Sequence, residues 1–240
     1  MHNSPAAFVL IPSRYHASRL PGKALLRIGD QTVIQKVYQQ ASLSKYSTQV
    51  ITDHPKIAES ILSIQGNVQL RKQQANNGTE RIFNYLLEND QNIQPDSVIV
   101  NVQGDEPLLN PLNIQKLVEC FEDAEVSVAS LYEEVIPREH YALPHRVKVE
   151  VTNGFATTFE RIVEENELEW HKHIGIYAFR WKTLKALMKL PPSPREIDLS
   201  LEQLRWLDHG YSIRMIKGYS NGVSIDTSSD ILEARNFLNS

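Results

Sequence analysis

Residues 97–107 read SVIVNVQGDEP, an apolar run that passes directly into an acidic turn. The run is apolar enough for a central strand, and Asp105 and Glu106 then fall at its carboxyl end, where open α/β sheets bind ligands. Asp105 is placed to hold Mg²⁺, a hard cation that takes oxygen ligands and usually shares them with substrate phosphates. Taken alone, the stretch is explained at least as well by an ordinary turn.

Short apolar runs alternate with helical patterns on either side of this stretch, as a parallel sheet with crossover helices requires. The expected strands are 7–11, 49–51, 97–101 and 126–131, and the expected helices are 32–42, 55–64, 79–87 and 111–121. Three further strands are expected close together, at 146–151, 156–159 and 174–179, which favours antiparallel pairing or a hairpin. The remaining expected elements are helices at 181–190, 199–207 and 230–238 and strands at 212–216 and 223–225.

The composition fits one compact domain, because 240 residues that are 41% hydrophobic and 22% charged can bury a substantial core. A formal net charge of -4 gives no general basic surface, so we expect no nucleic-acid partner. The single cysteine, Cys120, excludes an internal disulfide framework and fits the reducing cytoplasm. No apolar run approaches the roughly 20 residues that cross a bilayer, so we expect no membrane insertion.

Residues 11–23, IPSRYHASRLPGK, follow the first expected strand and carry three cations. Arg14 and Arg19 offer forked donors and Lys23 a point charge, a combination that suits the oxygens of a triphosphate. A solvated loop has no need of the Pro21-Gly22 pair that fixes the chain before Lys23. The GxxxxGK[ST] spacing is absent, which disfavours a P-loop NTPase.

A second aspartate, Asp226, ends a short apolar run in residues 223–227, VSIDT. Two strand-end aspartates are what a metal-bridged phosphoryl site would use. A helix cap is the alternative for Asp226, because the expected helix 230–238 follows closely.

Seven short motifs carry a resemblance: IPSRYHASRLPGK (11–23), GTER (78–81), NVQGDEPL (101–108), VKV (147–149), HIGIY (173–177), LEQLR (201–205) and IDT (225–227). With them the sequence resembles the 3-deoxy-manno-octulosonate (Kdo) cytidylyltransferases, or CMP-Kdo synthetases, as a divergent member. Each motif is weak alone, but their shared order over nearly the whole chain is highly specific.

The resemblance implies a fold and a reaction. The fold is a Rossmann-like three-layer α/β/α sandwich with a mixed, mostly parallel sheet, in one domain over 1–240 with a hairpin and dimerisation excursion at about 146–180. The reaction transfers CMP from CTP to the anomeric hydroxyl of a 3-deoxy-2-ulosonic acid, Kdo or a close relative, amino-substituted ones included, and releases pyrophosphate for cell-surface polysaccharide synthesis. The implied enzyme is a cytoplasmic, Mg²⁺-dependent homodimer.

The motifs also imply site residues by position. Those expected to bind the nucleotide are Pro12, Ser13, Arg14, Arg19, Lys23, Asn77, Gly78 and Arg81. Those expected to line the sugar site are Gln103, Arg161, His173, Tyr177, Glu202 and Gln203. Asp105 and Asp226 would hold Mg²⁺, and the catalytic set would be these two aspartates with Arg14 and Lys23.

The chain departs from the family pattern in two places. Ala75 stands where the family usually has histidine and Asn77 where it usually has serine, in a region expected to face CTP. The segment 160–169 is short and holds five glutamates, which would repel a carboxylate-bearing sugar or favour an amino-substituted one if they faced it; a solvated hairpin also explains them.

Two other functions stay open at this point. A nucleotidyltransferase for acylneuraminate or a sugar phosphate is disfavoured by the tract Arg14 to Arg19, because those enzymes usually have a more glycine-rich loop. A binding homologue that has lost turnover is disfavoured by Asp105 and Asp226, since a pure binder has less use for metal ligands.

Overall fold

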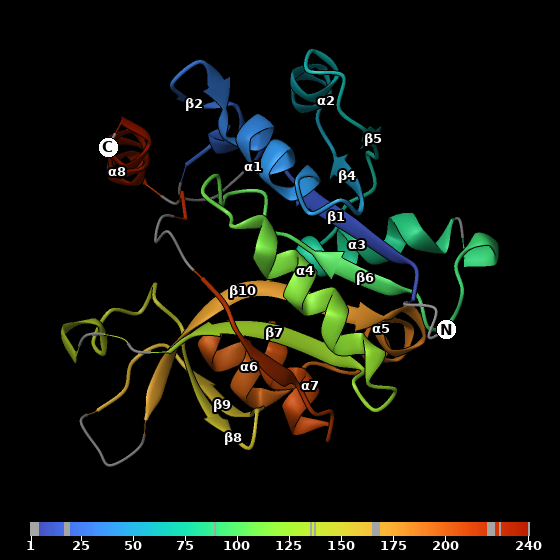
Figure 1. The fold of residues 1–240 in the computed structure, drawn as a ribbon, viewed down its shortest axis with the longest axis vertical. Helices are drawn as coiled ribbons and strands as arrows, with labels where there is room; N and C mark the ends of the chain where they lie inside the picture. The colour runs from blue at the N-terminus through green and yellow to red at the C-terminus, as the bar shows by residue number, and fades with distance from the viewer. Residues whose placement is uncertain are drawn as a thin grey trace.

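The structure is a computed structural model that describes residues 5–16, 20–88, 90–134, 136, 138–164, 169–219, 224–225 and 227–239. These residues form a nine-stranded sheet in the order β5-β4-β1-β6-β10-β7-β11-β9-β8, with helices on both sides (Figure 1). The strands of this sheet are β1 (Ala7–Ser13), β4 (Ser47–Thr52), β5 (Val68–Leu70), β6 (Val98–Asn101), β7 (Val128–Glu133), β8 (Lys148–Thr152), β9 (Phe155–Glu160), β10 (Trp170–Arg180) and β11 (Arg214–Lys217). A small separate ribbon pairs β2 (Arg27–Ile28) with β3 (Gln31–Thr32).

The helices are α1 (Val33–Ser42), α2 (Pro55–Leu62), α3 (Gly78–Leu87), α4 (Pro111–Glu119), α5 (Trp181–Leu187), α6 (Pro194–Leu199), α7 (Glu202–Asp208) and α8 (Ser228–Asn239). Short 3₁₀ turns lie at η1 (Lys23–Leu25), η2 (Asp90–Asn92), η3 (Cys120–Glu122) and η4 (Arg138–His140). None of the described helices combines the length and the apolar character that crossing a bilayer requires.

The sheet is mixed, as expected. Strands β5, β4, β1 and β6 pair in parallel, and β7 pairs in parallel with β11. Strand β10 lies between β6 and β7 and is antiparallel to both, and β9 is antiparallel to β8 and β11. Two of the nine strands, β9 and β10, therefore run against the others, which confirms a mixed and mostly parallel sheet.

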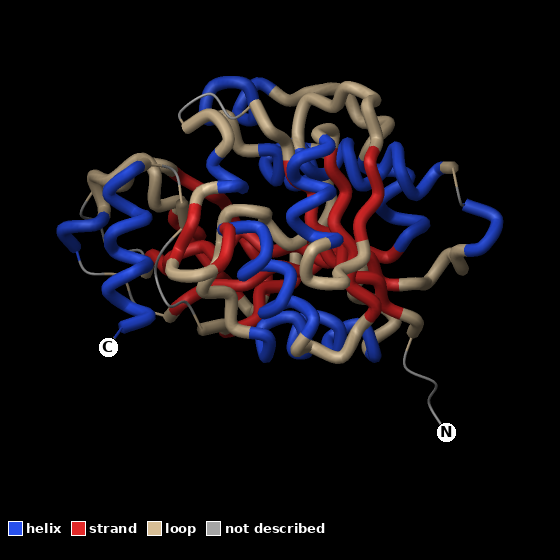
Figure 2. The backbone as a smooth tube through the Cα atoms, turned by 90° about the horizontal axis from the view of Figure 1, so that it is seen from above, coloured by secondary structure: helices blue, strands red, loops and turns tan. Residues whose placement is uncertain are grey.

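Alternation along the strands separates two buried layers. Val9 and Ile11 face one layer, which includes apolar residues of α1, α2, α4 and α8. Leu10, between them, faces the other, which includes residues of α3, α5 and α7. Successive side chains of a strand point to opposite faces, so one sheet buried on both sides gives the three-layer α/β/α arrangement, which Figure 2 shows from above.

Three details of the sequence-based expectation need correction. Ser224 and Ile225 form no strand; Ile225 instead donates its amide hydrogen to the carbonyl oxygen of Asp105 at 2.8 Å. Within the excursion expected at 146–180, β8 and β9 form a hairpin, but β10 returns to the centre of the sheet and pairs with β6. The helix expected at 199–207 begins only at Glu202, and it is preceded by the unexpected helix α6, which begins at a capping box between Ser193 and Glu196.

Candidate active site

Two glycines allow three segments to meet at the carboxyl end of β1. A Cβ atom on Gly104 would lie 2.9 Å from the carbonyl oxygen of Pro12, and one on Gly78 would lie 2.9 Å from Pro12 Cγ. Real Cβ atoms do not approach this closely, so only glycine fits at either position. The acidic turn after β6 and the first residue of α3 are thereby held directly against β1.

A pocket of about 330 Å³ opens at this junction, and we call it the phosphate pocket. Its lining residues are Pro12, Ser13, Arg14, Leu20, Lys23, Ala24, Ala75, Asn76, Asn77, Gly78, Arg81, Gln103, Gly104 and Asp105. Seven of the eight residues expected to bind the nucleotide are among them, and the eighth, Arg19, lies outside the described residues. Ala75, which departs from the family pattern, also faces this pocket.

The loop that carries Lys23 is fastened through Tyr15. The Tyr15 carbonyl oxygen accepts the Gly22 amide at 2.9 Å, and Gly22 adopts a left-handed φ of 71° that favours glycine. The Tyr15 ring stacks on His54 with 4.0 Å between centroids, and the Tyr15 amide donates to Asp53 Oδ1 at 3.2 Å. These contacts fix the position at which η1 begins with Lys23. They account for the Pro21-Gly22 pair that the sequence places before this lysine.

Arg81 is buried, with 6% of its surface exposed, and it faces the pocket from α3. Its Nη2 donates to Asp53 Oδ2 at 2.9 Å, whereas its Nη1 is buried and has no hydrogen-bond partner in the described structure. A buried cationic donor without an acceptor is costly, so Nη1 is suited to a phosphate oxygen of a ligand.

The N-terminus of α3 adds to this anion site. Asn77 caps the helix by accepting the Glu80 amide on its Oδ1 at 2.8 Å, and both Asn77 and Gly78 line the phosphate pocket. The first turn of a helix presents amide donors and a partial positive charge, which favour a phosphate. Asn77 is therefore a helix cap as well as a pocket residue.

Lys23 and Asp105 form an ion pair at the floor of the pocket, with side chains 17% and 23% exposed. Lys23 Nζ also donates to the carbonyl oxygen of Ile225 at 3.0 Å. Ile225 in turn is bonded through its amide to the Asp105 carbonyl oxygen. The predicted second metal ligand, Asp226, lies outside the described residues, but its neighbour Ile225 is tied to the acidic turn.

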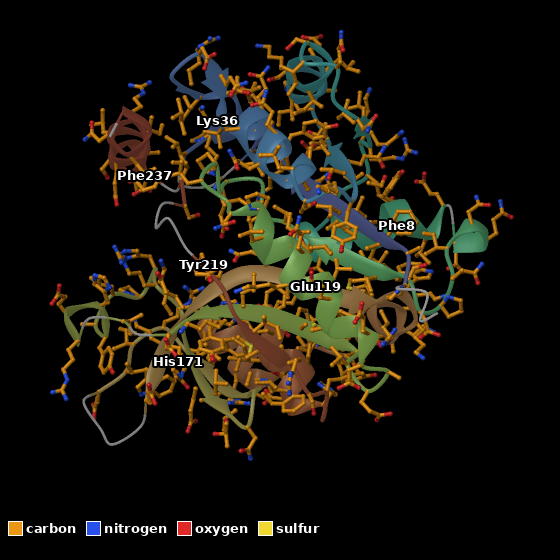
Figure 3. All side chains as sticks on the ribbon, viewed as in Figure 1. Phe8, Lys36, Glu119, His171, Tyr219 and Phe237 are labelled. Carbon is orange, nitrogen blue, oxygen red and sulfur yellow. The ribbon has the colours of Figure 1, made fainter. Side chains whose placement is uncertain are left out.

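Tyr219, which follows β11, is held by Asn113 of α4. Asn113 Nδ2 donates to the Tyr219 carbonyl oxygen at 2.7 Å, and its Oδ1 accepts the Tyr219 amide at 2.9 Å (Tyr219 is labelled in Figure 3). Asn113 is 1% exposed, so this two-way clamp is shielded from water.

The two oxygen atoms that accept hydrogen bonds from Lys23 Nζ belong to a carboxylate and to a main-chain carbonyl group. Both kinds of oxygen can coordinate Mg²⁺. Within the described ranges, no cluster of three or more His, Cys, Asp or Glu residues could hold a metal ion. One carboxylate and one carbonyl oxygen suit a magnesium ion that would take its other ligands from elsewhere, such as phosphate oxygens.

A second set of polar groups lies next to the phosphate pocket, and we call it the buried polar row: Thr79, Asn101, Ser130, His173, Tyr177 and Glu202. Glu202 Oε2 accepts from Thr79 Oγ1 at 2.7 Å, and Thr79 Oγ1 accepts from Asn101 Nδ2 at 3.2 Å. Three buried atoms of the row, Asn101 Oδ1, Tyr177 OH and Glu202 Oε1, have no hydrogen-bond partner in the described structure.

A bulge in β10 shapes the other end of the row. The register of β10 against β7 shifts between Ile174 and Tyr177. The Ser130 side chain of β7 forms a hydrogen bond with the main chain at this bulge. Because the Ser130 hydroxyl donates to the Ile176 carbonyl oxygen at 2.9 Å, it can accept a hydrogen bond from His173 Nε2, also at 2.9 Å. This arrangement selects the His173 tautomer with its proton on Nε2.

Burial shifts the pKa values of three groups in the row. Burial lowers the pKa of His173 to about 3, which keeps the imidazole uncharged at neutral pH. Burial, followed by the nearby Glu202 carboxyl, raises the pKa of Tyr177 well above its ordinary value. Burial also raises the pKa of Glu202. His173 and Tyr177 can therefore take part in hydrogen bonds while they are uncharged at neutral pH.

The residues expected to bind the sugar are thus partly brought together. His173, Tyr177 and Glu202 belong to the row, Gln203 is buried beside it in α7, and Gln103 lines the phosphate pocket while donating to the Gly175 carbonyl oxygen at 3.3 Å.

Arg161 is placed apart from the row. Its guanidinium donates to the carbonyl oxygens of Leu199, Pro144 and Ser200, the last two at 3.0 Å. It supports the turn that precedes α7, and so acts on Glu202 and Gln203 through the backbone rather than beside them.

Several site residues were missed from the sequence. Asp53 bonds both Tyr15 and Arg81, and it follows β4 just as Asp105 follows β6, so the strand-end signal could have identified it. Thr79 and Asn101 lie inside recognised motifs, but their bonds to each other and to α7 cross between distant segments.

Comparison with known proteins gives concordant results. The family model described as "Cytidylyltransferase" matches residues 8–215. A 3-deoxy-manno-octulosonate cytidylyltransferase of Lawsonia intracellularis is 38% identical and covers 95% of this chain and 92% of its own. An 8-amino-3,8-dideoxy-manno-octulosonate cytidylyltransferase of Shewanella woodyi is 36% identical and covers 93% of this chain and 94% of its own.

Among solved structures, a CMP:2-keto-3-deoxy-manno-octonic acid synthetase complexed with CTP superposes with a TM-score of 0.88 at 31% identity, over 98% of each chain. A 4-diphosphocytidyl-2C-methyl-D-erythritol synthase of Anaerococcus prevotii superposes with a TM-score of 0.64 at 12% identity, over 99% of this chain and 100% of its own, which is a likeness of fold alone.

Proposed function

The chain belongs to the cytidylyltransferase family, and from that premise we propose that it transfers CMP from CTP to the anomeric hydroxyl of a 3-deoxy-2-ulosonic acid and releases pyrophosphate. Kdo and its 8-amino relative are the two acceptors that the names of its relatives suggest. The observation that carries the proposal is the phosphate pocket, where Arg14, Lys23 and Arg81 gather beside Asp105.

The cationic side of the pocket would hold the triphosphate. Arg81 Nη1 lacks an acceptor, Arg14 lies at the end of β1, and the amides of α3 point toward the same space. Lys23 would add a point charge at the floor. Together these donors would stabilise the charge that grows on the departing pyrophosphate.

The buried polar row would hold the sugar acid. Its unpartnered atoms on Asn101, Tyr177 and Glu202 match sugar hydroxyls, which both donate and accept hydrogen bonds. The row meets the pocket where Thr79 follows Gly78 and where Gln103 reaches Gly175. A sugar in the row would therefore place its reacting hydroxyl near the α-phosphorus of the nucleotide.

The transfer is an in-line displacement at phosphorus. The anomeric oxygen forms a bond to the α-phosphorus, the bond from that phosphorus to the bridging oxygen breaks, and pyrophosphate leaves with both bonding electrons. The hydroxyl proton passes to water or to pyrophosphate. Asp105 would hold Mg²⁺ with Asp226, and the bound ion would neutralise phosphate charge and lower the pKa of the hydroxyl.

We further propose that the enzyme works as a homodimer in the cytoplasm and serves cell-surface polysaccharide synthesis. Exposed apolar side chains near the β8–β9 hairpin support a dimer, since Ile162 is 60% exposed and Ile197 is 66% exposed. Light scattering coupled to size exclusion tests the dimer, because a single-chain mass at micromolar concentration would contradict it.

A pyrophosphate-release assay tests the reaction. Purified protein with CTP and Mg²⁺ should release pyrophosphate with Kdo or with 8-amino-3,8-dideoxy-manno-octulosonate and form the CMP-sugar by mass. Acylneuraminate and a sugar 1-phosphate serve as comparison acceptors. CTP binding without release for any acid would show a binding homologue, and release with acylneuraminate alone would show a different transferase.

A further inference from the structure

Lys23 occupies a position between two segments that are distant in the chain. Its ammonium donates to the Asp105 carboxylate and to the Ile225 carbonyl oxygen, while Ile225 and Asp105 are joined through their main chains. The Lys23 ammonium therefore lies where these two oxygens, which are of the kind that coordinates Mg²⁺, come together. The protein thus supplies its own cation to this position.

We propose that Lys23 is a resident cation that neutralises Asp105 until the nucleotide arrives, so that the divalent ion binds tightly only together with CTP. This inference rests on the proposed function and adds an order of binding to it. Lys23 would leave Asp105 when triphosphate oxygens are present to accept its ammonium, and Asp105 would then be available to the metal ion.

The charges of the pocket support this exchange. Without nucleotide, a Lys23 ammonium displaced from Asp105 would remain among the cations of Arg14 and Arg81, whose repulsion opposes the displacement. A bound triphosphate reverses that balance, because it brings several anionic oxygens to the same cations. Metal and nucleotide would therefore each raise the affinity for the other by the same factor.

Another role of Lys23 predicts the opposite result. If the ammonium only held Asp105 in position for the metal, its removal would loosen the carboxylate and weaken metal binding. If it competes with the metal, its removal strengthens metal binding in the absence of CTP. The sign of the change separates the two roles.

The experiment measures binding of Mn²⁺ alone to the full chain by electron paramagnetic resonance, for the wild type and for Lys23→Met, Lys23→Arg and Arg14→Met. Lys23→Met should bind Mn²⁺ about five- to tenfold more tightly than the wild type, whereas Lys23→Arg, which keeps the cation, should stay within about twofold. Arg14→Met removes one cation from the same pocket but leaves Lys23 on Asp105, so its gain in Mn²⁺ affinity should be clearly smaller than that of Lys23→Met. Far-UV circular dichroism checks that each variant is folded.

The titrations are then repeated with CTP and without sugar acid, so that no transfer occurs. CTP should raise the Mn²⁺ affinity of the wild type by a larger factor than that of Lys23→Met. Unchanged or weaker Mn²⁺ binding by folded Lys23→Met would overturn the inference. An equal gain in Mn²⁺ affinity for Arg14→Met would also overturn it, because the loss of any positive charge in the pocket would then explain the result. Failure of the proposed function would be seen separately, as wild-type protein that forms no CMP-sugar.

Discussion

The phosphate pocket and the buried polar row lie side by side, but the first presents mainly charged groups from loops and helix ends, whereas the second presents mainly uncharged polar groups from strands, α3 and α7. Asp105 at the pocket is 23% exposed and stays partly hydrated, and the cations around it would bind an anionic ligand through charge. In the row, burial keeps His173 and Tyr177 uncharged, so recognition there depends on the position of each hydrogen bond. Substitutions in the two regions should therefore impair the enzyme in different ways.

The largest effect is expected in the pocket, at Asp105. Asp105→Asn removes the charge but little volume, so turnover should fall by about 10³-fold while the fold is retained. Steady-state pyrophosphate release gives the rate, and circular dichroism checks the fold. Asp30→Asn, which removes an exposed carboxylate elsewhere, is the control. Near-normal turnover of Asp105→Asn would contradict its role as a metal ligand.

A smaller effect on the same side is expected at Arg81. Arg81→Met would remove the charged hydrogen bond that we propose between Nη1 and the nucleotide, so KM for CTP should rise by about 10- to 100-fold while KM for the sugar acid stays constant. Arg71→Met is the matched control, because Arg71 pairs with Glu88 at the surface away from the pocket. Equal changes in both KM values would show that the two regions are not separate.

In the row, Tyr177→Phe should weaken binding of the sugar acid without lowering the stability of the fold. The Tyr177 hydroxyl is buried and has no hydrogen-bond partner among the residues that the structure describes, so its removal should leave the melting temperature unchanged or higher. KM for the sugar acid should rise by about five- to tenfold if that hydroxyl bonds a sugar group. Tyr132→Phe on β7 is the control. A lower melting temperature for Tyr177→Phe would reveal a bond within the protein and weaken the assignment.

The smallest effect is a pH dependence of stability from His173. Its pKa is about 3 in the folded chain against an ordinary value of 6.5, so below pH 6.5 the unfolded chain binds a proton that the folded chain does not. The free energy of unfolding should then fall by about 1 kcal/mol per pH unit between about pH 6 and pH 4.5.

Urea unfolding of the wild type and of His173→Asn isolates this contribution. Shifts of other groups, Glu106 and Glu202 among them, are common to both proteins and cancel in the difference. The stability difference should shrink as the pH falls. Parallel curves for the two proteins would show that His173 is protonated in the folded state as well.

The contrast between the two regions also explains what the sequence could predict. Arg14 follows β1 directly, and Lys23 and Asp105 lie in the loops after β1 and β6, so a run of apolar residues is enough to indicate their strand-end position. The row depends on side chains that meet across the sheet, such as Ser130 and His173, and no local pattern records which strands become neighbours. The motifs identified His173, Tyr177 and Glu202 as candidate site residues, but they did not predict the contacts that these side chains make.

The same limit applies to the fold. Alternation of Val9, Leu10 and Ile11 marks a strand buried on both faces, and the helices that cover it have clear apolar periods. The central place of β10 could not be predicted, because its pairing with β6 joins Tyr177 to Asn101 across a long sequence separation. Arg161 was expected beside the sugar because its motif suggested it, whereas its guanidinium is used by three carbonyl groups.

The contact between Lys23 and Ile225 spans 202 residues, and this separation has a consequence for how the enzyme is made. A chain emerging from the ribosome at about 5–20 residues per second presents the loop of Lys23 early and must wait tens of seconds at the slow end for residue 225. Long-range contacts form late and slow the final steps of folding. The nascent protein would therefore pair β1, β4, β5 and β6 first, and the floor of its nucleotide site would close only after residue 225 has emerged.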